Sequence, residues 1–337
     1  MMIVLADDIT GAAEIAGIAH TLGVDATVIA TDTRSMTEQE AVKTIADIAE
    51  RYGFADKECV VFKKVDSALR GHVVAEINTL LEHSHYKKAL YLPCNPSKGR
   101  IIRDGIYYIN NVPISNTDFS FDPEFPAFSS SLAERFPDLT SADAVSNDDI
   151  QRIVEATDSE TLLVGAADLF EAFCQTLSSP QTESADADSD HTEALNYIII
   201  QGSTQSKDLS DTEFFRHHNI QTCQMPDDVF DGRDRTDWIS RGGNICLTIP
   251  QKRKGNPQWL KRAMADAVNA LVNDSSTEWQ GTIIIEGGAT ACAILTALGW
   301  KDFEVEKEIA PGVVMLRHGN SHIILKPGSY PWGKLFD

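Results

Sequence analysis

Two adjacent aspartates follow a short apolar run near the start of this 337-residue chain. Residues 3–6 form the run, Asp7 and Asp8 come directly after it, and Thr10 opens an alanine-rich helical pattern. Open α/β sheets build many of their sites where a strand delivers polar side chains to the start of a helix. The structural alternative is that Asp8 or Thr10 only caps the helix. A cap accounts for one side chain, so the second acid is left without a packing role, and this favours a functional site.

A second polar cluster, KKVDSALRG, occupies residues 63–71 and follows the third apolar run of the chain. Arg70 is suited to binding a carboxylate through two hydrogen bonds, while Asp66 and Ser67 are suited to holding hydroxyls. The cluster therefore indicates recognition of a small polyhydroxy carboxylate. The alternative is that Asp66 or Ser67 caps a helix and Arg70 lies at the surface. Because both clusters follow strands of one predicted sheet, we expect them at the same sheet edge.

Glycine-containing turns follow two apolar runs in the second half of the chain. Gly202 and Ser203 come after the run at 195–200, and EGGATA at 286–291 comes after another. Glycines let the backbone approach a ligand closely, and N–H groups at the start of a helix bind phosphate. Ser203 is also a simple helix cap. Two such turns in one domain predict a nucleotide-binding cleft.

Charge and motif content exclude several classes of protein. The net charge of -21, without a long basic run, argues against a nucleic-acid-binding surface. The six cysteines are scattered and no histidine has metal-ligand spacing, so we expect reduced thiols and assign no metal ligand. No secretory segment or membrane-spanning run is recognisable, which predicts a cytoplasmic protein without membrane contact. No GxGxxG motif follows a predicted strand, so a standard dinucleotide-binding fold is not supported.

The elements that must position these residues alternate between strands and helices, which is typical of a mostly parallel α/β sheet. Thr37 and Glu40 form a predicted capping box at the start of the second helix. Residues 105–109 and 112–114 predict a hairpin with Asn110-Asn111 as its turn. In the first half we expect strands at 2–6, 25–30, 58–63, 88–92 and 161–164, and helices at 11–22, 37–52, 70–84 and 167–177.

An acidic stretch without apolar periodicity divides the chain at residues 178–194 and predicts a flexible linker. It separates a domain at 1–177 from a second α/β domain at 195–337. The predicted fold is therefore α/β, with two domains that each contain a mostly parallel or mixed sheet flanked by helices. In the second domain we expect strands at 195–200, 243–249, 281–285, 313–317 and 322–326, and helices at 205–217, 256–273 and 289–298.

Three motifs in sequence order resemble those of the four-carbon acid sugar kinase family. They are DDITGA at 7–12, KVDSALRG at 64–71 and EGGATA at 286–291. This resemblance implies that the first domain binds a sugar acid, that the second binds ATP with Mg²⁺, and that the active site lies in the cleft between them. It implies phosphorylation of the terminal hydroxyl of threonate, erythronate or a 3-oxo-tetronate. The DSALRG form is more similar to the threonate and erythronate kinases than to the 3-oxo branch.

The resemblance also assigns roles to individual residues. Asp7 or Asp8 would take the proton from the attacking hydroxyl or orient it, with Asp8 slightly favoured. Lys64, Asp66, Ser67 and Arg70 would bind the substrate. The nucleotide would contact Gly202, Ser203, Gly287, Gly288, Thr290, Pro311, Gly312, Lys326 and Gly328.

Departures from the family pattern at 286–291 and 326–331 leave an alternative in which a non-catalytic protein binds the sugar acid or nucleotide. A second alternative is a 3-oxo-tetronate kinase. We expect a small sugar acid as the partner of the protein, without nucleic acid or membrane. The oligomeric state stays open, with a homodimer as one alternative.

Overall fold

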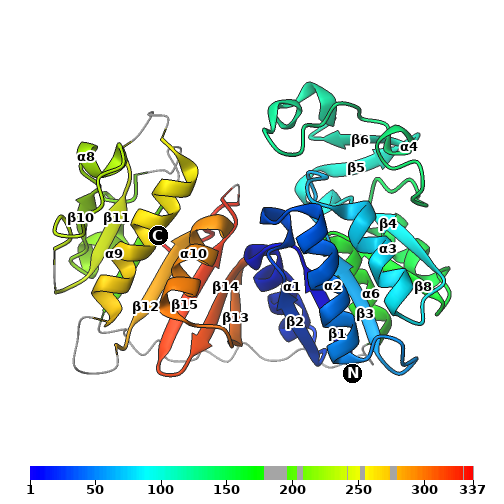
Figure 1. Ribbon diagram of the computed structural model, residues 1–337, viewed down its shortest axis with the longest axis horizontal. Coiled ribbons are helices and arrows are strands. Elements are labelled where there is room, and N and C mark those ends of the chain that lie inside the picture. Colours follow the sequence, from blue (N-terminus) through cyan, green and yellow to red (C-terminus); the bar gives the residue numbers. More distant parts are fainter. Residues whose placement is uncertain are drawn as a thin grey trace. The chain divides into compact units, whose positions relative to one another are not determined.

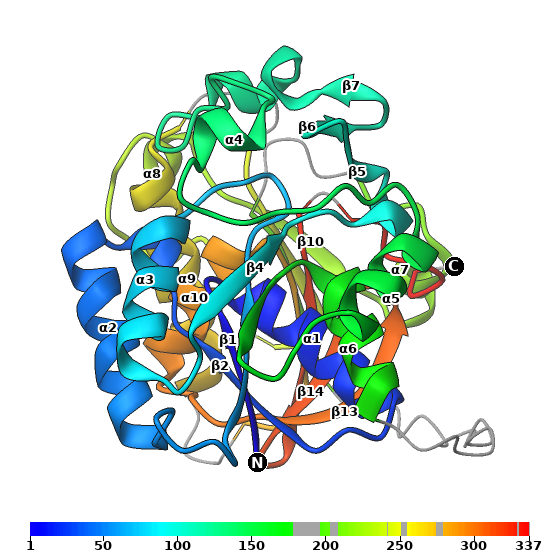
Figure 2. The same cartoon turned by 90° about the vertical axis from the view of Figure 1, so that its right-hand side faces the viewer.

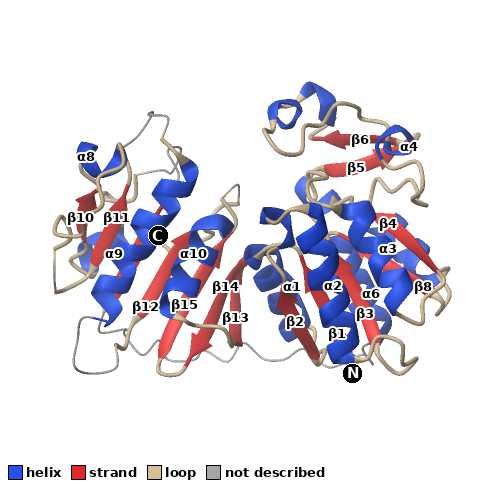
Figure 3. Ribbon diagram, in the orientation of Figure 1, coloured by secondary structure: helices blue, strands red, loops and turns tan. Residues whose placement is uncertain are grey.

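The computed structural model describes residues 1–177, 196–202, 208–240, 242–250, 255–273, 279–328 and 330–336 (Figure 1). The chain divides into two compact units, Met1–Thr182 and Glu183–Asp337. The predicted linker at 178–194 and the predicted site residue Ser203 lie outside the described residues. Within each unit, helices flank a parallel or mixed sheet, which confirms the predicted α/β class (Figure 3).

The sheet of the first unit has five parallel strands in the order β2-β1-β3-β8-β4. Ala6 pairs with Ala30 and with Lys64, and Lys64 pairs with Gly165, so the carboxyl ends of four strands are in register. Residues that follow these strands therefore meet at one edge. The strands are β1 (Met2–Ala6), β2 (Ala26–Ala30), β3 (Val60–Lys64), β4 (Lys88–Leu92) and β8 (Thr161–Gly165).

Helices cover both faces of this sheet, with α2 and α3 on one side and α1, α5 and α6 on the other (Figure 2). Burial on both faces explains why all five residues of β1 are apolar. The predicted capping box of Thr37 and Glu40 is confirmed at the start of α2. The helices are α1 (Ile9–Thr21), α2 (Glu38–Tyr52), α3 (Val73–His83), α4 (Leu132–Arg135), α5 (Asn147–Glu155) and α6 (Ala167–Leu177).

A small antiparallel sheet, β5 (Arg100–Arg103), β6 (Ile106–Ile109) and β7 (Val112–Pro113), follows β4. The predicted hairpin is confirmed as β6 and β7. Its turn residues Asn110 and Asn111 have φ values of 50° and 64°, the left-handed conformation that a two-residue hairpin turn requires. Strand β5 was not predicted. Short 3-10 helices occur at Thr33–Ser35, Pro96–Lys98, Ile114–Asn116 and Asp118–Phe121.

The second unit contains a seven-stranded sheet in the order β10-β11-β9-β12-β15-β14-β13. Its first five strands are parallel, and β14 and β13 are added antiparallel. The strands are β9 (Tyr197–Gln201), β10 (Gln221–Gln224), β11 (Ile245–Thr248), β12 (Thr282–Glu286), β13 (Glu304–Ala310), β14 (Val313–His318) and β15 (Ser321–Lys326). The helices are α7 (Glu213–His217), α8 (Asp227–Phe230), α9 (Pro257–Asn273) and α10 (Gly288–Leu298).

The structure corrects two expected elements. The described part of the predicted helix at 205–217 is helical only over Glu213–His217, because Thr212 caps the helix at that point. The helix expected at 70–84 begins at Val73, since Gly71 has a φ of 100°, which a helix does not allow. Among the described residues, no helix combines the length and apolar character needed to cross a membrane.

Candidate functional site

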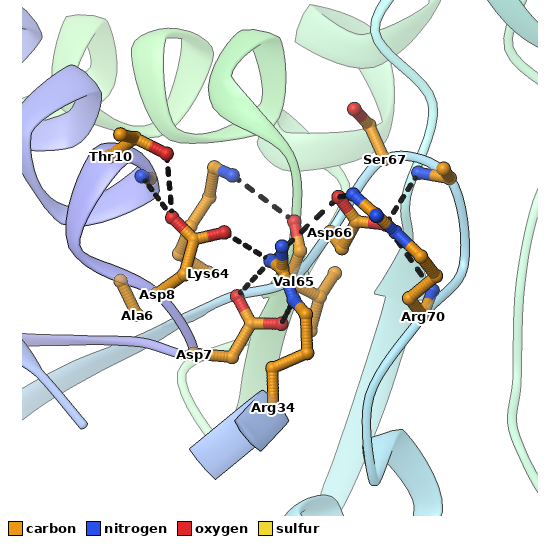
Figure 4. A network of polar contacts seen from close by, with 12 residues as sticks. Ala6, Asp7, Asp8, Thr10, Arg34, Lys64, Val65, Asp66, Ser67 and Arg70 are labelled. Carbon is orange, nitrogen blue, oxygen red and sulfur yellow. Dashed lines mark hydrogen bonds and ion pairs between the residues drawn. The ribbon is translucent and has the colours of Figure 1, made fainter. Parts of the chain in front are cut away.

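Arg34 gathers the carboxylates of the predicted acid cluster, although the sequence analysis did not select it (Figure 4). Its Nε lies 3.0 Å from Oδ2 of Asp7 and its Nη2 lies 2.9 Å from Oδ1. The same Nη2 is 2.5 Å from Oδ2 of Asp8 and 3.7 Å from Oδ1 of Asp66. Arg34 lies in the 3-10 turn that follows β2, the neighbour of β1 in the sheet. Its place after a strand at the same edge is the sequence signal that could have identified it.

Asp8 has both the capping role and a place in the charged cluster. Its Oδ1 accepts hydrogen bonds from the backbone N–H of Gly11 at 2.6 Å and from the hydroxyl of Thr10 at 2.9 Å. Its Oδ2 faces Arg34. A Cβ on Gly11 would lie 3.3 Å from both Asp8 Oδ1 and Lys64 Nζ, so the glycine leaves room for this arrangement. One acid can therefore cap α1 and still present a charged oxygen to the site.

The adjacent aspartates have pKa values shifted in opposite directions. Burial raises the pKa of Asp7 above its ordinary value, against the attraction of Arg34. Burial also opposes ionisation of Asp8, but Arg34 and Lys64 outweigh it and hold the pKa of Asp8 below its ordinary value. Opposite shifts in neighbouring acids are typical of groups with different chemical roles.

Asp66 and Arg70 form a bidentate pair inside the turn that follows β3. Arg70 Nε lies 2.8 Å from Asp66 Oδ2, and Nη2 lies 3.1 Å from Oδ1. Burial disfavours the charged form of Asp66, yet Arg34 and Arg70 hold the pKa of this acid far below its ordinary value. The forked face of Arg70, which the sequence analysis assigned to a substrate carboxylate, here binds Asp66. The remaining Nη1 lies 3.9 Å from Oδ2 of Asp122.

Lys63 and Lys64 are the last two residues of β3, which ends one residue beyond the strand expected at 58–63, and they point to opposite faces of the sheet. Lys64 Nζ reaches the acid cluster, where it donates to the carbonyl of Val65 at 3.1 Å and lies 3.7 Å from Oε2 of Glu14. Lys63 is fully buried, with its Nζ 2.5 Å from Oε2 of Glu76 in α3. Lys64 therefore belongs to the candidate site, whereas Lys63 ties β3 to α3.

Ser67 is held by two residues of the small antiparallel sheet, neither of which the sequence analysis selected. Arg100 Nη1 donates to the hydroxyl of Ser67, and the hydroxyl of Tyr107 donates to the backbone carbonyl of Ser67 at 2.6 Å. Ser67 and Tyr107 are buried, and Arg100 is partly buried. The small sheet therefore forms part of the candidate sugar-acid site.

A cavity of about 600 Å³ lies in the second unit at the start of α10. Gly287 has a φ of 96° and no side chain caps the helix, so the first N–H groups of α10 lack partners within the helix. This arrangement suits an anion such as phosphate. Of the predicted nucleotide residues, Gly202, Gly287, Gly288, Thr290 and Gly328 line the cavity.

Gly202 and Lys261 extend this assignment. A Cβ at Gly202 would lie 2.7 Å from Oγ1 of Thr290, so only glycine lets the end of β9 approach α10 this closely. Lys261, on α9, adds a lysine to the cavity lining. The sequence did not identify Lys261, because no motif surrounds it and because only the packing of α9 shows that it faces the cavity.

Lys326 and the Pro311-Gly312 turn have other surroundings. Lys326 Nζ lies 3.0 Å from Oε1 of Glu286 and donates to the carbonyls of Pro327, Gly328 and Tyr330 at 3.0, 3.2 and 2.8 Å. These acceptors use all three of its N–H groups. Lys326 therefore fixes the turn after β15.

The Pro311-Gly312 turn joins β13 to β14, and Gly312 N–H donates to Oε1 of Glu308 at 2.8 Å. Neither Pro311, Gly312 nor Lys326 is among the residues that line the cavity.

The residues around the cavity suit a nucleotide better than a metal ion held by the protein alone. The glycine-lined cavity and the uncapped helix fit a nucleotide phosphate. Across the part of the chain that the structure describes, no group of three or more His, Cys, Asp or Glu side chains is arranged to hold a metal ion. A divalent cation that is held mainly by the phosphates of its nucleotide fits these residues.

Two family models match the chain. The sugar-binding N-terminal domain matches residues 2–141, and the nucleotide-binding C-terminal domain matches residues 247–330. The chain is 30% identical to D-threonate kinase of Salmonella typhimurium over 40% of this chain and 35% of that protein. It is 22% identical to 3-oxo-tetronate kinase of Actinobacillus succinogenes over 99% of this chain and 97% of that protein. The match to the D-threonate kinase thus spans about a third of that protein's length.

Solved structures show the same fold. A Haemophilus influenzae protein of family DUF1537 has a TM-score of 0.70 and 20% identity, over 99% of this chain and 98% of that chain. A Salmonella typhimurium LT2 protein has a TM-score of 0.75 and 16% identity, over 98% of this chain and 96% of that chain. Fold and site define a two-unit α/β protein with a sugar-binding and a nucleotide-binding part. The chain belongs to the four-carbon acid sugar kinase family.

Proposed function

We propose that the protein is an ATP-dependent kinase that phosphorylates the terminal hydroxyl of a four-carbon sugar acid, D-threonate or D-erythronate. One observation carries this proposal. Each family model covers a polar site at the carboxyl ends of parallel strands, the acid cluster around Arg34 in one unit and the glycine-lined cavity at α10 in the other. A kinase needs one site for the acceptor and one for the donor, and this chain has a candidate for each.

In the acceptor site, Asp8 contacts the attacking hydroxyl. Its side chain is 18% exposed, whereas that of Asp7 is 4% exposed and has both oxygens bound to Arg34. Phosphoryl transfer depends on orientation and charge neutralisation more than on a strong base, so an acid with a lowered pKa is suitable. Asp7 fixes Arg34, and Arg34 in turn orients Asp8. Lys64 adds positive charge beside them.

Asp66 and Ser67 line the same site and contact the acceptor. Arg70 positions Asp66 through its two hydrogen bonds and keeps it ionised. An ionised Asp66 accepts hydrogen bonds from substrate hydroxyls. The structural alternative, in which this turn only caps a helix, has less support because α3 begins at Val73 without a side-chain cap.

In the donor site, the N–H groups at the start of α10 bind the phosphates of ATP, and Lys261 supplies a side-chain charge. Gly202, Gly287 and Gly328 let the backbone approach the nucleotide. Mg²⁺ would be held mainly by the phosphates of a nucleotide bound at the start of α10 and would offset their negative charge. Ser203, Pro311, Gly312 and Lys326 remain sequence assignments, and for Lys326 the geometry favours a structural role.

The test is ATP-dependent phosphorylation of a panel that contains D-threonate, D-erythronate, their L-forms and 3-oxo-tetronate, measured as ADP release above a control without acceptor. A strong preference for D-threonate or D-erythronate supports the proposal. A preference for the 3-oxo acid identifies the alternative kinase, which the near full-length match to a 3-oxo-tetronate kinase favours. Binding of acids without turnover of any of them identifies a non-catalytic binding protein.

A further inference from the structure

The cations of the acid cluster are already paired with acids of the protein. Arg34 binds Asp7 and Asp8, and Arg70 binds Asp66. Lys64 lies next to Glu14. An anionic substrate that pairs with Arg34 or Arg70 must therefore compete with a buried carboxylate, and the displaced carboxylate loses its partner at considerable cost. A separate cation is the better anchor for a substrate carboxylate.

Arg100 is such a cation. Its guanidinium has five N–H donors, and Nη1 contacts the hydroxyl of Ser67. Among the residues that the structure describes, no ion pair joins Arg100 to a carboxylate. The residue is partly buried at the start of β5, so its charge is shielded from water but accessible. A planar guanidinium in this state is well suited to binding a carboxylate through two parallel hydrogen bonds.

The backbone around Arg100 is held firmly. Its N–H donates to the carbonyl of Asn95 at 3.1 Å, and its carbonyl accepts from the N–H of Asn95 at 2.7 Å. The hydroxyl of Tyr107 donates to the carbonyls of Ser67 and Pro93 at 2.6 and 3.1 Å. The loop after β3, the loop after β4 and the small sheet are thus joined at one point. This rigidity reduces the entropy that Arg100 loses when a ligand binds.

A continuous set of contacts leads from Arg100 to Asp8, the residue proposed to contact the attacking hydroxyl. Arg100 contacts Ser67, Ser67 adjoins Asp66 in sequence, and Asp66 lies 3.7 Å from the Arg34 nitrogen that binds Asp8. One end of this set carries a cation and the other carries the acid assigned to the hydroxyl. A sugar acid has the complementary polarity, with a carboxylate at one end and a terminal hydroxyl at the other.

We propose that Arg100 binds the substrate carboxylate and selects sugar acids over neutral polyhydroxy compounds. This inference rests on the proposed function and identifies the residue that recognises the carboxylate of the substrate. Ser67, which contacts the acceptor, also positions Arg100 through its hydroxyl, and Arg70 positions Asp66. The assignment differs from the sequence-based one, in which Arg70 binds the substrate carboxylate.

The experiment measures binding of D-threonate and of its neutral amide, D-threonamide, to the full chain without ATP by calorimetry. D-erythronate and its amide are measured in parallel. The variants are Arg100→Gln, Arg100→Lys and Arg70→Gln, and Arg103→Gln is the matched control because Arg103 lies on the same strand and stacks on Tyr108. Wild-type protein is expected to bind the acid more tightly than the amide.

Arg100→Gln is expected to weaken binding of the acid by about 10- to 100-fold and to change binding of the amide by less than about 3-fold, as loss of a charged hydrogen-bond partner predicts. Arg100→Lys keeps the charge but not the fork, so the acid should lose about 3- to 10-fold. This variant still decides the question where Arg100→Gln fails to fold. Arg103→Gln should leave both affinities unchanged.

Three results overturn the inference. In the first, Arg100→Gln still binds the acid more tightly than the amide, whereas Arg70→Gln binds the two equally. This result assigns the substrate carboxylate to Arg70 and does not contradict the proposed kinase activity. Equal loss of acid and amide binding in Arg100→Gln shows a structural role. If the wild-type protein binds no acid and phosphorylates none in the panel, the proposed function and this inference both fail.

Discussion

Arg34 binds Asp7 through two nearly equal hydrogen bonds, 3.0 Å from Nε to Oδ2 and 2.9 Å from Nη2 to Oδ1. The side chain of Asp7 is 4% exposed, so this pair is removed from water. A buried ion pair depends on both partners, because the partner left behind is a desolvated charge. Arg34 serves Asp8 and Asp66 as well, which makes it the residue on which the acid cluster depends most.

We expect Arg34→Gln to lower the free energy of unfolding by about 3–5 kcal/mol at pH 7, as measured by urea denaturation. Asp8 and Asp66 have lowered pKa values, so their contribution to stability is present above their ordinary pKa and is lost as pH falls through the folded pKa. The difference between wild type and variant should therefore narrow as pH falls below about 4, the ordinary pKa of an aspartate. A difference that stays constant from neutral to acidic pH would contradict this account. Arg34→Lys is the control that keeps the charge.

The effect of Asp7→Asn on stability should depend on pH in the opposite direction from that of Arg34→Gln. Burial raises the pKa of Asp7, so its favourable contribution is present below the ordinary pKa and is lost as pH rises through the raised value. The variant should gain stability relative to wild type as pH increases over that interval, while turnover falls because Arg34 loses its main partner. Denaturation curves across this pH range, measured together with kcat, test the prediction. A variant that becomes relatively less stable as pH rises would show that ionised Asp7 is stabilising.

Much of the fold was predictable because it is encoded locally. Strand β1 is buried on both faces and reads as a continuous apolar run, and α2 carries its own capping box. The helix at 213–217 was predicted too long because the start of a short helix depends on one cap, Thr212, and not on periodicity. Strand β5 has four residues with arginine at both ends, so its pairing with β6 is set by tertiary contacts.

The candidate site was predictable only where its residues share a motif. Asp8 and Asp66 follow strands and have strong local signals. Arg34 and Arg100 lie in a short 3-10 turn and a four-residue strand, and they join the site through side chains that reach across the sheet edge. The spacing of residues did not reveal that Arg70 is paired with Asp66, so Arg70 was assigned to a ligand. The bidentate pair depends on the left-handed φ of 63° at Leu69, which reverses the chain.

Substitutions of Asp8 separate its capping role from its chemical role. Both Asp8→Asn and Asp8→Ala lose the charge that pairs with Arg34, but Asp8→Asn keeps an oxygen that accepts from the N–H of Gly11. Asp8→Ala should therefore be less stable than Asp8→Asn by about 1 kcal/mol, the cost of the lost cap. Both variants should lower kcat by about 10²- to 10⁴-fold, because both remove the charged oxygen. ATP affinity should be unchanged in each. Full turnover in Asp8→Asn would leave Asp8 with the cap alone and transfer the chemical role to Asp7.

Lys261→Met tests the donor site. Because Lys261 lines the cavity at the start of α10, loss of its charge should weaken ATP binding by about 10-fold and leave adenosine binding unchanged. Arg262→Met is the matched control, since Arg262 is the next residue on α9 and lies 3.6 Å from both Asp234 and Asp266. Equal weakening of ATP and adenosine would indicate a packing role for Lys261 instead of a phosphate contact.

Lys326→Met should act on stability and not on phosphate recognition. Lys326 is 2% exposed and its Nζ lies 3.0 Å from Oε1 of Glu286, so its removal leaves a buried carboxylate without this cation. We expect a loss of about 3–5 kcal/mol in the unfolding of the second unit, and partial recovery in the double variant Lys326→Met with Glu286→Gln. D-threonate affinity, which depends on the first unit, should be unchanged. A variant that keeps wild-type stability but loses ATP binding would return Lys326 to the nucleotide site.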